Sequence, residues 1–73
     1  METEIALIQL LAETASGRFD TLKIMSSRAE KNDQTWQNVL HHLCDHHLNG
    51  ANLRKILNGE GMRKLVADTI GQM

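Results

Sequence analysis

The side chains that could carry chemistry gather in one segment of this 73-residue chain, His41-His42-Leu43-Cys44-Asp45-His46-His47. Residues four apart lie on one side of a helix, so His42 and His46 form a pair of imidazoles that could bind zinc, copper or nickel. No face of such a helix gathers three or four ligands, and the remaining chain has no other Cys or His. A closed metal site within one subunit is therefore not expected. A metal-binding protein that shares His42 and His46 between two subunits is the third functional hypothesis.

Cys44 and His47 are the one pair in this segment that could act as nucleophile and base, because residues three apart on a helix can touch. The sequence supplies neither an oxyanion hole nor a third group that would orient the histidine. Gly59-Glu60-Gly61 lacks the Lys-Ser/Thr spacing of a phosphate-binding loop. We therefore predict that the protein is not an enzyme and needs neither cofactor nor metal for folding.

The strongest local charge lies in a near-repeat, in which residues 48–56 and 57–65 share one pattern. The pattern is Leu-Asn-Gly, two variable residues, an apolar residue, Arg-Lys and another apolar residue. It places Arg54-Lys55 and Arg63-Lys64 directly after apolar residues that should point inward, so both pairs should project outward. The four cations are the predicted partner-binding residues, facing an acidic protein surface or phosphates. The alternative is that they only solvate two short helices.

A helix-turn-helix motif was tested against the same region, because a helix, a turn at Gly50 and a short helix superficially fit it. With Gly50 at the turn, Asp45 and Asn49 fall at positions that the motif buries, and His46 falls at the position that needs a small residue. The sequence therefore does not favour this form of DNA binding.

The first thirty residues provide the main structural element that must position these groups. Their apolar and small residues recur in alternating steps of three and four, the spacing of a heptad seam: Ile5, Ile8, Ala12, Ala15, Phe19, Leu22, Ser26 and Ala29. Ser16-Gly17 could end a helix there, with Asp20 capping a second one. Because the heptad phase continues unbroken, we predict one helix over about residues 3–31.

The rest of the chain predicts three shorter helices, over about residues 34–48, 51–58 and 61–71. Asp33 is the expected N-cap of the first of these, and Asn49-Gly50 its left-handed end. Its inner face should contain Trp36, Val39, Leu40, Leu43 and His47. The expected fold is all-α, with residues 1–73 forming a single helical domain.

Composition and length restrict the class of protein further. The net charge is −1, there is no proline, and Phe19 and Trp36 are the only aromatic residues. A single cysteine fits a reducing compartment, and no apolar segment approaches the ~20 residues of a membrane span. Since the first residues also lack a basic region before the apolar run, we expect a soluble cytoplasmic protein without membrane contact.

A helix of about 28 residues would be roughly 42 Å long, and the shorter helices would cover it thinly. Burying the seam against a second copy would stabilise so small a chain. We therefore predict a homodimer whose interface contains Ile5, Ile8, Ala12, Ala15, Phe19 and Leu22. The leading functional hypothesis is a small non-enzymatic regulator, adapter or inhibitor that binds another macromolecule, with another protein as the expected partner. The alternative is a nucleic-acid-binding regulator that uses the two basic pairs.

Overall fold

The computed structural model describes residues 2–15 and 17–73, which form helices joined by short turns. The helices are α1 (Glu2–Thr14), α2 (Phe19–Ala29), α3 (Asp33–Cys44), α4 (Gly50–Leu57) and α5 (Met62–Gly71). The predicted all-α fold is confirmed. No helix of the described residues is long and apolar enough to cross a membrane.

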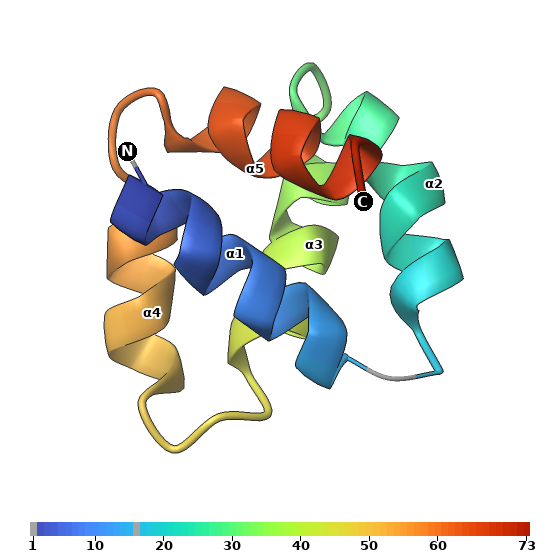
Figure 1. Ribbon diagram of the computed structural model, residues 1–73. Coiled ribbons are helices and arrows are strands. Elements are labelled where there is room, and N and C mark those ends of the chain that lie inside the picture. Colours follow the sequence, from blue (N-terminus) through green and yellow to red (C-terminus); the bar gives the residue numbers. More distant parts are fainter. Residues whose placement is uncertain (1, 16) are drawn as a thin grey trace.

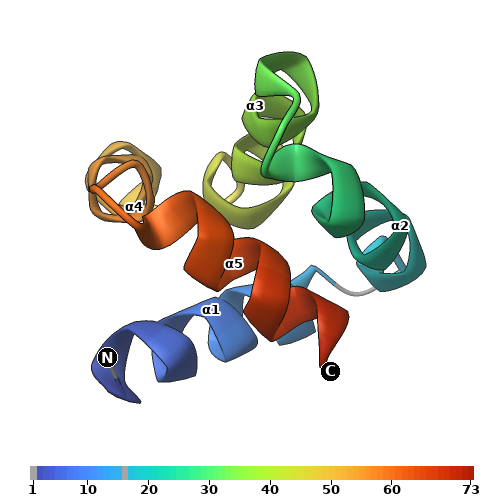
Figure 2. The ribbon, with the colours of Figure 1, turned by 90° about the horizontal axis from the view of Figure 1, so that it is seen from above.

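Helix α5 runs along the top of the molecule in Figure 1 and packs against α1, α2 and α4. Helix α3 packs against α2 and α4 and also contacts α1. Seen from above, α1 and α3 lie on opposite sides of α5 (Figure 2). The core between these helices is mostly aliphatic, and Trp36, which is 1% exposed, is the only aromatic side chain among its fully buried described residues. The predicted inner face of α3 is confirmed for Trp36, Val39, Leu40 and Leu43, all of which are buried.

The single helix predicted over residues 3–31 is wrong: the chain turns between α1 and α2. Gly17 has φ 79°, a left-handed conformation that glycine adopts without the steric cost of a Cβ. The molecule measures 28 × 26 × 23 Å, so a straight helix of about 42 Å would extend beyond it. The turn instead brings both halves of the seam to one core. Ser16, the other residue of the predicted break, lies outside the described residues.

The seam is used within one copy of the chain. Ile8, Ala12 and Leu22 have no exposed surface, whereas Ile5, Ala15 and Phe19 are half-buried. Three of the six residues predicted to form a homodimer interface therefore have no surface to offer a second copy of this fold. Homodimerisation stays a prediction, and between two copies that are each folded in this way it would require another part of the surface.

The predicted helix over residues 34–48 is shorter at its C-terminal end, where α3 stops at Cys44. Its N-cap is Asn32 rather than Asp33, since the Asn32 side chain accepts a hydrogen bond of 2.9 Å from the Thr35 amide. Residues 45–49 form an irregular turn that separates His46 and His47 from the helix.

The turn after α3 depends on Gly50, although not through the left-handed conformation that we expected. Among the described glycines, Gly17 and Gly61 have a positive φ, whereas Gly50 does not. Gly50 is instead the first residue of α4. A Cβ on Gly50 would lie 2.5 Å from the carbonyl oxygen of Cys44. Glycine is therefore required because the start of α4 packs directly against the end of α3.

Candidate binding site

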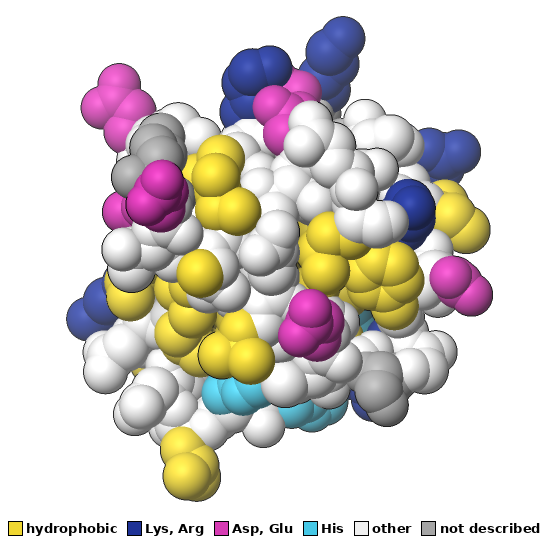
Figure 3. Space-filling model, in the orientation of Figure 1, with side chains coloured by type: hydrophobic (Ala, Val, Ile, Leu, Met, Phe, Trp, Pro, Cys, Tyr) yellow, Lys and Arg dark blue, Asp and Glu magenta, His cyan; other side chains and the backbone are white. Residues whose placement is uncertain are grey.

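The described surface contains two adjoining hollows, the larger of which we term the apolar groove. It has a volume of about 530 Å³ and is lined by Leu7, Leu10, Leu11, Thr14, His46, His47, Leu48, Asn49 and Leu53. Leu10 is 56% exposed, and Leu48 is fully exposed. Figure 3 shows hydrophobic side chains gathered over α1, histidines below them, and a further hydrophobic side chain at the lower edge, where the α3–α4 turn lies.

The groove follows from an apolar stripe on α1 that is wider than the core can cover. Leu11 is buried, Leu7 is half-buried and Leu10 faces solvent. The opposite wall comes from Leu53 on α4 and from the turn before it. Leu48 and Leu57 occupy equivalent positions in the two copies of the near-repeat, yet Leu57 is completely buried and Leu48 is not. The same local pattern thus gives one core residue and one surface residue.

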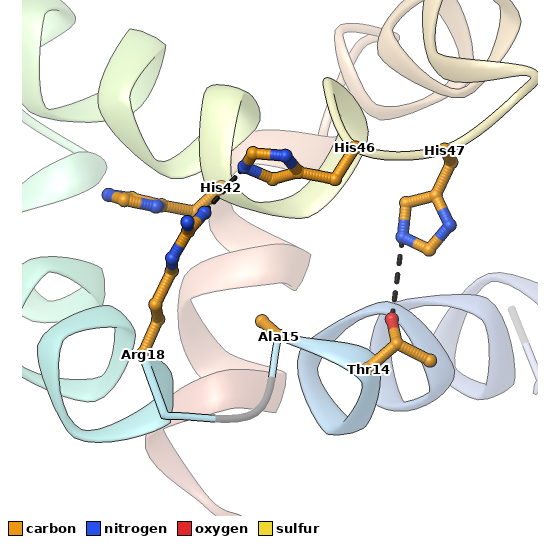
Figure 4. Close-up of a pocket in the computed structure, with 6 residues that line it drawn as sticks. All are labelled: Thr14, Ala15, Arg18, His42, His46 and His47. Atoms are coloured by element: carbon orange, nitrogen blue, oxygen red, sulfur yellow. Dashed lines mark hydrogen bonds between the residues drawn. The ribbon is translucent and has the colours of Figure 1, made fainter.

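The second hollow, which we term the basic pocket, has a volume of about 270 Å³. It is lined by Thr14, Ala15, Arg18, His42, His46 and His47. Figure 4 shows these side chains approaching one another from α1, the segment before α2, α3 and the α3–α4 turn. A hydrogen bond joins Arg18 Nη1 to His46 Nε2, and Thr14 Oγ1 lies 3.4 Å from His47 Nε2. The two hollows share Thr14, His46 and His47, so they form one continuous site.

The electrostatic environment of the basic pocket disfavours further positive charge. Burial lowers the pKa of His42, and the nearby positive charge of Arg18 and the other histidines lowers it further. The Nδ1 atom of His42 is buried and has no hydrogen-bond partner within the described part of the chain. His42 is consequently neutral near pH 7 and has an unused polar atom.

This shift predicts a stability change below neutral pH. The folded pKa of His42 lies below the unfolded value of 6.5, so the unfolded chain binds the proton first. Neutral His42 therefore makes its full contribution to the free energy of unfolding above pH 6.5. That contribution is lost as the pH falls through the lower pKa of the folded state. Urea unfolding at pH 7.5 and pH 5.0 should show a smaller loss of stability for His42→Gln than for wild type. Equal losses would contradict the role of His42.

The basic pair Arg54-Lys55 lies at the surface, but the guanidinium of Arg54 is bound within the fold. Its Nε and Nη2 donate to the two carboxylate oxygens of Asp45 at 3.2 Å each, and its Nη1 donates to Gln37 at 3.0 Å. Asp45 also accepts a hydrogen bond of 2.6 Å from His41 Nδ1. Hydrogen bonds from Arg54 and His41 lower the pKa of Asp45. This cluster fastens α4 to the end of α3.

The second pair, Arg63-Lys64, is similarly engaged. Arg63 donates to Asp33 at 2.7 Å and lies 5.4 Å from the centre of the Trp36 ring, and Lys64 lies 3.6 Å from Asp68. The predicted outward projection agrees with the partial exposure of these side chains. Three of the four cations already contact an acidic residue of this chain, which reduces the positive charge that they can offer to a partner. Their role in partner binding stays a prediction.

Separate observations argue against a metal site at His42 and His46 and against Cys44 as a nucleophile. Within the described residues, no group of three or more Cys, His, Asp or Glu side chains could hold a metal ion. The Arg18 guanidinium beside His46 also opposes a cation there. Burial raises the pKa of the Cys44 thiol to about 11, so this thiol is protonated near neutral pH and is a poor nucleophile.

Arg18, Leu10 and Leu48 are the site residues that the sequence did not indicate. Leu10 lies outside the heptad seam, and Arg18 is the single cation among residues 1–20. Comparison of the chain with protein-family models, curated proteins and solved structures found no match.

Proposed function

We propose that this chain is a non-enzymatic binding protein whose apolar groove accepts an amphipathic helix of another protein. The full exposure of Leu48 beside Leu10 carries the proposal. An exposed apolar surface that borders a hollow is typical of an interaction site in a small protein. The groove lies between α1 and α4, and two helical walls suit a third helix that inserts residues at steps of three and four.

The nucleic-acid alternative has less support. Arg54 and Arg63 pair with Asp45 and Asp33, and the chain as a whole carries a net charge of −1. Phosphate binding depends on cations that are free to replace counterions. An apolar partner surface is therefore a better match to this molecule than a nucleic-acid backbone.

The variant Leu48→Glu tests the groove, because replacing a fully exposed leucine should leave the fold intact. Loss of one buried leucine contact corresponds to about 1.5–3 kcal/mol, or roughly a 10- to 150-fold weaker complex. A photo-reactive residue at position 48 would identify the partner by mass spectrometry. A peptide of the cross-linked segment would then be titrated against both proteins, with circular dichroism recording helix formation.

The matched control is Ile24→Glu, which places the same charge on an exposed residue outside the groove. The control should bind like wild type. Equal affinity of Leu48→Glu and wild type, or the absence of a cross-linked protein, would overturn the proposal. Sedimentation completes the test. If wild type is a dimer and Leu48→Glu is a monomer, a second copy of this chain occupies the groove. That result would also overturn the proposal that the partner is a different protein.

A further inference from the structure

We propose that the basic pocket binds a carboxylate, and that Arg18, His42 and His46 thereby recognise an acidic side chain of the segment in the apolar groove. This inference rests on the proposed function for the source of the carboxylate, but the pocket can be tested without the groove. It gives the partner a definite chemistry, an apolar helix face with an adjacent Asp or Glu.

The first observation is the pairing of the arginines. Arg54 and Arg63 each contact a carboxylate of this chain, at 3.2 Å and 2.7 Å. Arg18 contacts the imidazole of His46 instead, and none of the described residues that line the basic pocket is acidic. A guanidinium has five N–H donors and can offer two of them in parallel to one carboxylate. Arg18 therefore retains the capacity that Arg54 and Arg63 have used within the fold.

The second observation is the convergence of basic groups from separate segments. Arg18 precedes α2, His42 belongs to α3 and His46 belongs to the α3–α4 turn, and Figure 4 shows Arg18 directed at the two histidines. Protonation of His42 beside Arg18 is unfavourable, and the buried Nδ1 of His42 has no partner among the described residues. An anion in the pocket would balance the charge of Arg18 and supply a hydrogen-bond acceptor.

The charge and position of the pocket favour a carboxylate over a phosphate. Near neutral pH, Arg18 contributes one fixed positive charge and His42 is neutral. The single charge of Arg18 matches the single negative charge of a carboxylate. A phosphate monoester has close to two negative charges above its second pKa of about 6. The pocket also shares Thr14, His46 and His47 with the apolar groove. One ligand can therefore place an acidic group in the pocket and apolar side chains in the groove.

The experiment titrates the full chain with acetate and, separately, with methyl phosphate at pH 7.5 and constant ionic strength set by chloride. Imidazole signals of His42 and His46 are followed by nuclear magnetic resonance. Acetate should give saturable shifts of both signals by about 50 mM. A pH titration at that concentration should show that acetate raises the apparent pKa of His42. Arg18→Gln should weaken acetate binding at least about tenfold. The matched control Arg28→Gln changes an exposed arginine outside the pocket and should bind acetate like wild type.

The outcomes separate this inference from the proposed function. Acetate has no apolar part, so Leu48→Glu should bind it normally even if the groove binds no protein. Absence of saturation, shifts that chloride reproduces, or unchanged binding by Arg18→Gln would overturn the carboxylate site. Tighter binding of methyl phosphate than of acetate would overturn the assignment of a carboxylate.

Discussion

Replacing Trp36 by alanine is expected to unfold the protein or leave it with almost no stability at 25 °C. Trp36 is 1% exposed, and truncation of a buried tryptophan costs about 3–5 kcal/mol. A domain of this size has only about 5 kcal/mol to lose. The indole also donates a 2.9 Å hydrogen bond from Nε1 to Asn58 Oδ1, and this bond joins α3 to the segment after α4. Circular dichroism during heating and urea titration would measure the loss.

Trp36→Phe is the matched control, because it retains an aromatic ring but removes the N–H donor. It should remain folded and lose about 1–3 kcal/mol, the cost of a smaller side chain and an unmade hydrogen bond. If Trp36→Ala melted within a few degrees of wild type, the central position of Trp36 in the core would be wrong.

Gly50→Ala is expected to be the most damaging of the glycine substitutions. The new Cβ would lie 2.5 Å from the Cys44 carbonyl oxygen, and neither atom belongs to a flexible side-chain end. The backbone must therefore shift, at a cost of about 1–3 kcal/mol. Such a shift would also displace α4 and the α3–α4 turn, which carries Leu48, so partner binding should weaken together with stability.

Gly71→Ala provides the comparison, since it introduces the same methyl group where no described atom outside the neighbouring residues and backbone of its own helix lies within 4 Å. Gly71 belongs to α5, and alanine in a helix is more favourable than glycine by up to about 1 kcal/mol. Urea unfolding should thus move in opposite directions for the two variants. Similar midpoints would contradict the close approach of α4 to α3.

The two C-terminal helices could be predicted from apolar periodicity. The predicted ranges 51–58 and 61–71 differ from α4 and α5 by no more than one residue at any end. The errors fall at the two turns that depend on tertiary packing. Gly17 interrupts a heptad that continues in register on both sides, and Gly50 ends a helical pattern through contact with Cys44 rather than through its own φ. The possible break at Ser16-Gly17 is visible in the sequence, but the unbroken heptad spacing outweighed it. The contact between Gly50 and Cys44 is not visible in a window of sequence.

The candidate site was less predictable, because it forms where two turns meet. Arg18 and His46 are 28 residues apart and come into contact only after α1 and α2 fold against α3. The basic pairs showed the opposite problem. Their charge is clear from the sequence, but Asp33 lies 30 residues from the arginine that it binds. A local charge count therefore overstated the positive charge available to a partner.

The turn at Gly17 also bears on how the chain could exchange parts between molecules. Because apolar spacing is unchanged across the turn, a straightened α1–α2 segment would present the same seam as one helix. Helix α1 would then leave its own core and could regain its contacts with α5 only in another copy, which is domain swapping. Such a dimer and the monomer would share one set of core contacts and differ at a single hinge. Because glycine adopts left-handed and helical conformations at similar cost, Gly17 can take either of the two forms.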